Sequence, residues 1–382
     1  MMITLYKTAG LALPSLFWML LPLLAVAALA VGWKYMTDYV FSRLEYSREF
    51  TEEGAFEGEG LCFVETVVNP TPFPIFFLDA EAYLYSELEL ADYIPERDNN
   101  MQYMVSRFNL MPYMKIKRKH NINCKKRGHY AVESVQLWKG KRNRYVDSPA
   151  EVYVYPAILD SGFYPSPMSV LQGNNVSSRR LISDPFSFAG IRDYRFGDSL
   201  SSVNFKASAK APVIDYSSIK VNKRDHCSNR NIMICINFQT DSQQSIPAKE
   251  YGVLMERALS FASALIFEAI SQGYKVGISA NCRTSSSDKL ICPMLSGNAH
   301  YIELLKGLSQ VRTQAGASVV SLFERDLESC VSLTEYYFMT TYVSDLINEK
   351  ISSLERYSNT VNIIMLDGIF GGEGGGGAKY DR

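Results

Sequence analysis

The stretch RNIMICINF, residues 230–238, decides the fold of the C-terminal half of this chain. It is a short, continuous apolar run bounded by polar residues, which is typical of a parallel strand buried on both faces of its sheet. Apolar residues at helical spacing follow over 248–273, and Gly273 stands where a C-terminal cap belongs. A buried strand followed by an amphipathic helix predicts an α/β unit.

The same alternation continues to the end of the chain. Strands are expected in YKVGISA, EYYFMTTY and TVNIIML, with helices around 300–311, around 317–330 and over 346–358. Strands that alternate with helices predict a doubly wound α/β domain over 230–368. The glycine-rich segment that follows predicts a flexible tail over 369–382.

The region upstream has the pattern of β-structure. Partly alternating apolar residues, broken by Asn69, Pro70, Pro72 and Pro74, begin a series of short strand candidates. Several short strands separated by turn residues predict a small β-sandwich-like domain over 44–160. Residues 161–229 are then a connecting strap between the two domains.

The N-terminus carries an uncharged apolar run, GLALPSLFWMLLPLLAVAALAVGW, over 10–33. Its length predicts one transmembrane helix within a membrane anchor over 1–35. Ala28-Leu29-Ala30 leaves open a cleaved signal peptide. Lys34, Arg43 and Arg48 follow the run, so the positive-inside rule favours a single-pass cell-membrane protein with cytoplasmic soluble domains.

Composition narrows the classes of function. The 382 residues are 47% hydrophobic and 21% charged, which indicates ordered domains, and the net charge of −1 gives no global field to attract nucleic acid. We expect no nucleic-acid partner. Seven widely spaced cysteines without a C-x-x-C do not resemble a zinc site or a disulfide framework. No P-loop, G-x-S-x-G or H-E-x-x-H is present, so we expect no enzyme.

A basic run lies in the β-rich region. Two interpretations stay open: solvated strand ends and loops, or lipid-facing residues in contact with anionic headgroups. The run consists of Lys115, Lys117, Arg118, Lys119, Lys125, Lys126 and Arg127.

Residues 190–209, GIRDYRFGDSLSSVNFKASA, resemble the signature of the prokaryotic family called domain of unknown function 58. The sequence departs from that signature at Asp193, Val203 and Phe205, which stand for glutamate, isoleucine and tryptophan, and it lacks the usual arginine near Ser202. Arg127-Gly128-His129-Tyr130 and Tyr155-Pro156 resemble two further elements of the family. The signature residues are candidates for an interaction surface, since arginine and aromatic residues are frequent interface anchors. These residues are Gly190, Arg192, Tyr194, Gly197, Asp198, Phe205, Lys206 and Ser208.

The resemblance implies a von Willebrand factor A-like α/β domain. Such domains bind magnesium through D-x-S-x-S after the first strand and an acid after a later strand. Here Asn237, Gln239 and Asp241 occupy the first three positions, and Thr341 stands where the later acid belongs, with Asp345 four residues on. Magnesium prefers charged oxygen ligands, so we expect a degenerate metal site and no cofactor.

The resemblance also implies a function. Similar proteins suggest a membrane-anchored, non-enzymatic interaction or assembly protein that works with a MoxR-type AAA ATPase. Two alternatives stay open: metal-dependent ligand binding of the adhesion type, and a hydrolase. Neither a nucleophile–base pair nor a convergent set of carboxylates is evident for the second.

Overall fold

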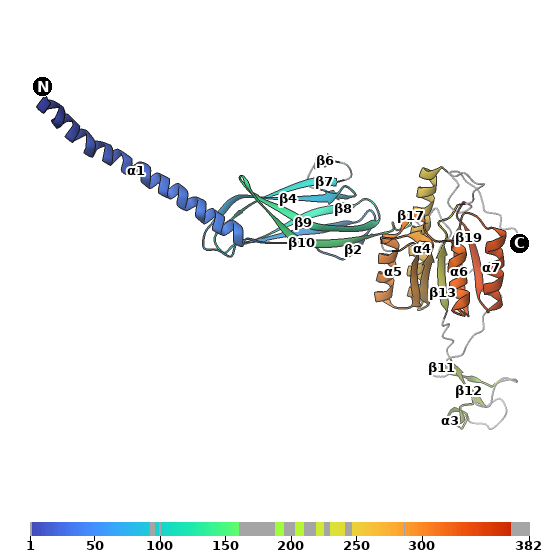
Figure 1. Ribbon diagram of the computed structural model, residues 1–382. Helices are drawn as coiled ribbons and strands as arrows, with labels where there is room; N and C mark the ends of the chain where they lie inside the picture. The colour runs from blue at the N-terminus through green and yellow to red at the C-terminus, as the bar shows by residue number, and fades with distance from the viewer. Residues whose placement is uncertain are drawn as a thin grey trace. The chain divides into compact units, whose positions relative to one another are not determined.

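The computed structural model describes residues 2–91, 96–98, 101–159, 188–194, 203–209, 219–224, 230–240, 247–285 and 287–367. Within these ranges, only the backbone is described for 2–20, 96–98, 188–190 and 222–224. The chain divides into two compact units after Ala157. We call Met1–Ala157 the β unit and Ile158–Arg382 the α/β unit; each is described by itself (Figure 1).

Two sheets form the β unit. One has the strand order β1-β3-β8-β5 and the other β2-β10-β9-β4-β7-β6, and all their pairings are antiparallel except β2 with β10. The strands are β1 (Glu45–Phe50), β2 (Gly54–Phe56), β3 (Gly60–Val68), β4 (Ile75–Tyr85), β5 (Leu88–Leu90), β6 (Glu96–Asp98), β7 (Met101–Leu110), β8 (Lys115–Cys124), β9 (Gly128–Lys139) and β10 (Arg142–Tyr155).

Alternation of side chains gives the two sheets one shared core. In β7, every second residue from Gln102 to Leu110 is buried while the residues between them are more exposed, because successive side chains of a strand point to opposite faces. Phe63 from the first sheet and Leu78 from the second belong to the same buried cluster. The core therefore lies between the sheets.

Helix α1 (Met2–Arg43) joins this core only at its C-terminal end. Val40 and Phe41 are buried with the strands. The guanidinium of Arg144 donates to the carbonyl oxygens of Ser42 at 2.7 Å and Leu44 at 2.5 Å, and Arg142 is ion-paired with Asp38. Carbonyls at a helix end have no partner inside the helix, so Arg144 supplies one.

The prediction of a transmembrane helix was wrong. No helix in the part of the chain that is described is long and apolar enough to cross a membrane. The C-terminal end of α1, with Val40 and Phe41, is buried against the strands of the β unit. The prediction of a single-pass cell-membrane protein was wrong for the same reason.

The α/β unit contains a five-stranded sheet of order β16-β14-β13-β18-β19. Its strands pair in parallel except β16, which runs antiparallel to β14 at one edge. The strands are β13 (Asn231–Ile236), β14 (Lys275–Ala280), β16 (Leu290–Leu295), β18 (Thr334–Thr340) and β19 (Thr360–Met365).

Helices cover both faces of this sheet (Figure 1). Ile232, Ile234 and Ile236 pack with α4 and α5 on one face, while Met233 and Cys235 pack with α6 and α7 on the other. Burial on both faces explains why β13 is a continuous apolar run. The helices are α4 (Ala248–Ser271), α5 (Asn298–Gln310), α6 (Val319–Glu328) and α7 (Asp345–Arg356).

Two smaller pairs of strands complete the described elements. β15 (Cys282–Arg283) pairs with β17 (Arg312–Ala315), and β11 (Phe188–Asp193) pairs with β12 (Lys220–Arg224) next to the short helix α3 (Phe205–Ser208). The described part of the chain thus has six helices, and strands make up 44% of it. The predicted fold class, which combined two domains with a transmembrane helix, is therefore corrected to mostly β-sheet with some helices.

Candidate functional site

Polar side chains gather where three central strands of the α/β unit end. Asn237 follows β13, Asn281 follows β14, and Thr340 is the last residue of β18. These strands are parallel neighbours, so their carboxyl ends meet at one edge of the sheet. Open α/β sheets bind their ligands at this edge. We therefore take it as the candidate site.

The three side chains form one hydrogen-bonded network. Asn281 Nδ2 donates to Asn237 Oδ1 at 2.9 Å, and Asn237 Nδ2 donates to Thr340 Oγ1 at 3.0 Å. Thr340 Oγ1 donates to the carbonyl oxygen of Tyr342 at 2.7 Å. The backbone N–H of Phe238 donates to Asn281 Oδ1 at 2.6 Å. The network ties the ends of β13, β14 and β18 to one another.

Burial makes this network rigid. Asn237, Asn281 and Thr340 are each completely buried. Buried polar groups are costly unless they are hydrogen-bonded, and here both polar atoms of each amide have partners. The network carries no formal charge, so it holds the strand ends together without drawing in a counter-ion.

An open depression of about 510 Å³ lies beside the network. The Tyr251 hydroxyl donates to the carbonyl oxygen of Phe238 at 2.8 Å, and burial raises the pKa of that phenol. Gln239 Oε1 accepts the backbone N–H of Val319 at 3.0 Å and so caps the start of α6. The lining is aromatic, amide and small: Phe238, Gln239, Thr240, Ala248, Tyr251, Gln314, Ala315 and Tyr342.

The residues predicted for the degenerate metal site are only partly brought together. Asn237 contacts Thr340 and not the predicted Thr341, whose buried hydroxyl has no hydrogen-bond partner among the described residues. Asp345 is exposed in the first turn of α7, and Asp241 lies outside the described residues. The part of the chain that is described holds no group of three His, Cys, Asp or Glu side chains suited to a metal ion.

Asn281 was missed by the sequence reading. Its signal was available, because an asparagine directly follows the predicted strand YKVGISA. A polar residue at a strand end is common, however, and nothing local links Asn281 to Asn237, which lies 44 positions away.

We expect magnesium to leave the thermal unfolding of the full chain unchanged. The network around Asn237 offers neutral oxygens already engaged with protein donors, and magnesium gives up its water shell only for charged oxygens. A thermal-shift titration at constant ionic strength, with sodium as the control ion, measures the response. Stabilisation at micromolar magnesium that disappears in Asp241→Ala would contradict this expectation.

The predicted interaction residues lie partly in the β11–β12 pair. Gly190 and Arg192 are in β11, Tyr194 follows it, and Gly197 and Asp198 lie outside the described residues. Phe205, Lys206 and Ser208 form much of α3. The Phe205 side chain is largely exposed, since 77% of that residue is accessible.

Ser208 joins α3 to β12. Its hydroxyl accepts the backbone N–H of Lys220 at 2.9 Å and donates to the carbonyl oxygen of Asn204 at 2.9 Å. Lys220 is also ion-paired with Asp193, and Asn204 caps α3 by accepting the N–H of Ala207. Several residues of the signature therefore have local structural roles.

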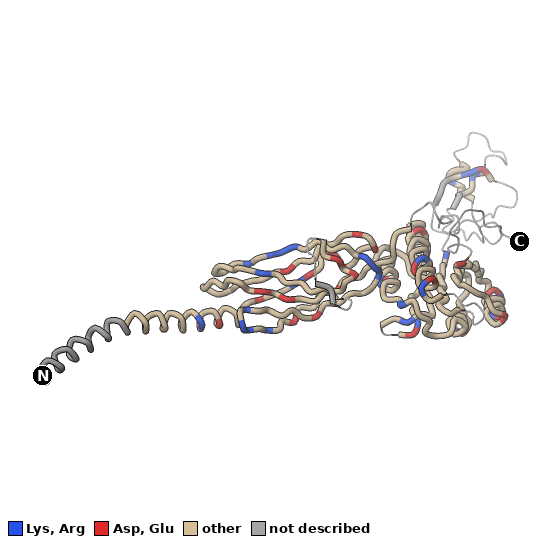
Figure 2. The backbone as a smooth tube through the Cα atoms, turned by 90° about the horizontal axis from the view of Figure 1, so that it is seen from above, with Lys and Arg blue, Asp and Glu red and all other residues tan. Residues whose placement is uncertain are grey.

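The predicted basic residues differ in exposure and in partners. Lys115, Lys117 and Lys119 are exposed on β8, whereas Arg127 is buried. Lys125 is ion-paired with Glu89 at 2.8 Å. Figure 2 shows acidic residues interspersed with basic ones along the strands of the β unit. Lys126 is exposed, and Arg118 donates to the carbonyl oxygen of Arg107. The lipid-facing role of the basic run stays a prediction.

Comparisons with known proteins do not assign a family. No family model and no curated protein matches the chain. The CARDB domain of a Pyrococcus furiosus protein is 12% identical with a TM-score of 0.22, over 29% of this chain and 93% of that one. A PapD-like domain of human CEP192 is 12% identical with a TM-score of 0.19, over 29% and 84%. A Listeria innocua β-glucosidase is 8% identical with a TM-score of 0.18, over 29% and 17%.

These likenesses are too weak to carry an argument about fold or function. They also give no support to the resemblance to the domain of unknown function 58 family or to von Willebrand factor A domains, which stays a prediction.

Proposed function

We propose that this chain is a non-enzymatic protein that binds a protein partner at the carboxyl edge of the parallel sheet in its α/β unit. The observation that carries the proposal is the uncharged, fully hydrogen-bonded network of Asn237, Asn281 and Thr340 beside an open depression.

The chemistry of the depression supports binding rather than catalysis. Acid–base and nucleophilic catalysis depend on titratable groups within reach of the reacting atoms. The side chains lining the depression are amides, hydroxyls, rings and methyl groups, and the Tyr251 phenol, with its raised pKa, is bound to a backbone carbonyl. Aromatic side chains combined with uncharged polar groups suit a protein interface, whose centre is depleted in charge.

The partner that we propose is a MoxR-type AAA ATPase. This part of the proposal rests on the resemblance of residues 190–209 to the domain of unknown function 58 signature. The depression is open and uncharged, which fits an extended or loop segment of a folded partner better than a small charged metabolite.

We expect Gln314→Glu to weaken binding of the full chain to the MoxR-type ATPase of its own organism by about tenfold. Gln314 is exposed and lines the depression, so the carboxylate would have to be desolvated in the interface. Calorimetric titration of the two purified proteins measures the dissociation constant.

Asn348→Asp is the matched control, because it also turns an exposed amide of this unit into an acid, on α7 and outside the lining. Equal affinity of both variants and the unchanged chain would argue against this surface, and absence of any binding would remove the ATPase as partner. Turnover in a panel of hydrolase assays would contradict the non-enzymatic proposal.

A further inference from the structure

One end of the β unit exposes a cluster of large apolar side chains. They come from the loop before β4, the start of β4 and the turn between β7 and β8. We call Phe73, Phe77, Met111, Tyr113 and Met114 the aromatic rim; all five are exposed.

The two most exposed aromatic residues of the rim have a strained backbone. Phe77 is 63% exposed with φ of 54°, and Tyr113 is 70% exposed with φ of 55°. This left-handed region is unfavourable for bulky side chains and is normally occupied by glycine or asparagine. Phe77 lies where the pairing of β4 with β7 shifts register, so it is the extra residue of a bulge.

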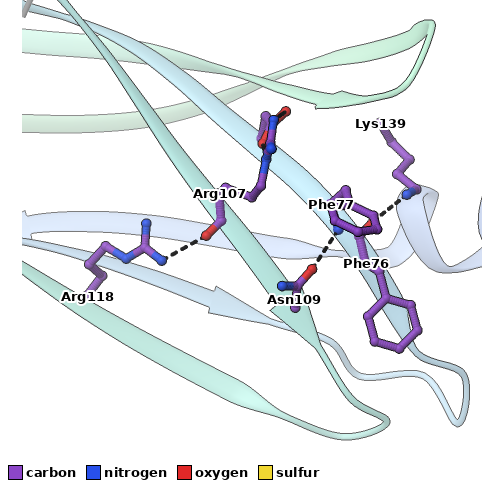
Figure 3. A network of polar contacts seen from close by, with 7 residues as sticks. Phe76, Phe77, Arg107, Asn109, Arg118 and Lys139 are labelled. Atoms are coloured by element: carbon purple, nitrogen blue, oxygen red, sulfur yellow. Dashed lines mark hydrogen bonds and ion pairs between the residues drawn. The ribbon is translucent and has the colours of Figure 1, made fainter.

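Polar contacts hold both residues in this conformation. The N–H of Phe77 donates to Asn109 Oδ1 at 2.8 Å (Figure 3), and the N–H of Tyr113 donates to the carbonyl oxygen of Thr71 at 3.1 Å. Asn69 is fully buried, and its Nδ2 donates to the carbonyl oxygens of Phe73 at 2.8 Å and Met111 at 3.0 Å. One buried amide therefore fixes the loop and the turn together.

One cation, Lys139, lies against the rim, and Arg118 lies on a neighbouring strand. Lys139 lies over the ring of Phe77, 5.7 Å from its centroid, and donates to the carbonyl oxygen of Phe76. Arg118 donates to the carbonyl oxygen of Arg107 at 2.8 Å (Figure 3). Its guanidinium also lies over the Phe108 ring, 4.4 Å from the centroid. Arg107 itself is ion-paired with the carboxylate of Asp79. Lys139 and Arg118 are thus both anchored through backbone carbonyls.

We propose that the aromatic rim is a docking surface for a protein partner that offers an apolar pocket with acidic residues at its edge. The pocket takes the rings of Phe77 and Tyr113, and the acidic edge meets Lys139. Rigid aromatic anchors surrounded by polar contacts are typical of interface hot spots.

The strain favours a protein over a lipid surface. A fluid lipid surface makes no demand on the position of a side chain, so it gives no reason to keep a bulky residue in a left-handed conformation. A folded partner does, because the affinity depends on anchors that are already in place. Strain that surrounding contacts maintain at exposed residues is characteristic of functional sites.

Asparagine substitutions test whether the aromatic rings serve function rather than the fold. Because asparagine tolerates the left-handed region, Phe77→Asn and Tyr113→Asn in the full chain should unfold at the same temperature as the unchanged protein or higher. A lower unfolding temperature for both variants would mean that the rings stabilise the fold, and the proposal would fail.

Site-specific crosslinking identifies the partner. The full chain is expressed in its own cells with p-benzoylphenylalanine in place of Tyr113, or in place of Tyr145, which is 69% exposed on β10 and serves as the control. We expect one protein adduct of defined mass from position 113 and none from 145. The adduct should disappear when Phe77→Asn or Lys139→Glu is added, and each change should weaken binding of the purified partner about tenfold.

Three results would overturn the proposal. The first is equal adducts from positions 113 and 145, and the second is no protein adduct at all. The third is that, without any protein adduct, the unchanged chain floats with phosphatidylethanolamine–phosphatidylglycerol vesicles while the Tyr113→Asn variant does not. The last result would assign the rim to a lipid surface instead.

Discussion

Glu65→Gln is expected to lower the free energy of unfolding of the β unit by about 3–5 kcal/mol, the cost of breaking a buried charged pair. Glu65 is completely buried between the two sheets. Its carboxylate accepts hydrogen bonds from Tyr46 at 2.6 Å, Ser106 at 2.5 Å and His120 at 2.8 Å. The glutamine amide offers one oxygen where the carboxylate offers two, so at least one of these three donors loses its acceptor.

The charge of Glu65 also balances a buried cation. Arg48 is 4% exposed and donates to the carbonyl oxygens of Ser148 at 2.8 Å and Ser134 at 3.1 Å. Burial lowers the pKa of Arg48, and the negative charge of Glu65 partly opposes that shift. Neutralising Glu65 leaves Arg48 with carbonyl dipoles alone, which adds to the loss of stability.

The stability difference should depend on pH. Burial raises the pKa of Glu65, but the hydrogen bonds from His120, Ser106 and Tyr46 outweigh it, and the net pKa is lowered. A lowered folded-state pKa stabilises the protein above the unfolded value of about 4.3, and this stabilisation is lost as pH falls through the folded pKa. The difference between the unchanged chain and Glu65→Gln should therefore shrink on acidification.

Urea unfolding followed by tryptophan fluorescence measures this effect, because Trp18, Trp33 and Trp138 all belong to the β unit. Glu133→Gln, at an exposed position of β9, is the control and should change the unfolding free energy by less than about 0.5 kcal/mol. A Glu65→Gln variant as stable as this control would show that the buried carboxylate is dispensable.

Asn281→Leu is expected to destabilise the α/β unit by about 3 kcal/mol, since a buried donor left without an acceptor costs about 1–3 kcal/mol and further hydrogen bonds are lost with it. Leucine is similar in size to asparagine but has no polar atoms. The N–H of Phe238 would lose its acceptor, and Asn237 Oδ1 would lose the donor from Asn281.

Hydrogen exchange over Asn231–Ile236, the whole of β13, reports this change within the full chain. Asn348→Leu is the control, because Asn348 is exposed on α7. We also expect Asn281→Leu to reduce partner binding, since Phe238 lines the depression and is positioned by Asn281. Exchange rates in β13 equal to those of the control would mean that the network does not hold the strand ends.

Local patterns determined much of the secondary structure. The apolar run RNIMICINF contains β13, and the helically spaced residues after it form α4 over Ala248–Ser271. Periodicity is a property of neighbouring residues and so can be read without the fold. The N-terminal run shows the limit of such reading: its length predicted a transmembrane helix, and no helix in the described part of the chain is long and apolar enough to cross a membrane.

Tertiary structure alone decided which residues meet. Thr340 and not Thr341 contacts Asn237, because neighbouring residues at a strand end point in opposite directions and the sequence does not fix that register. Asn281 lies in the site, where it donates to Asn237. Glu65 is a buried carboxylate with hydrogen-bond partners from β1, β7 and β8. By itself the sequence determined many of the elements, because helices and strands follow largely from local spacing. The site, the buried charge and the strained rim required the fold, because their partners come from strands far apart along the chain.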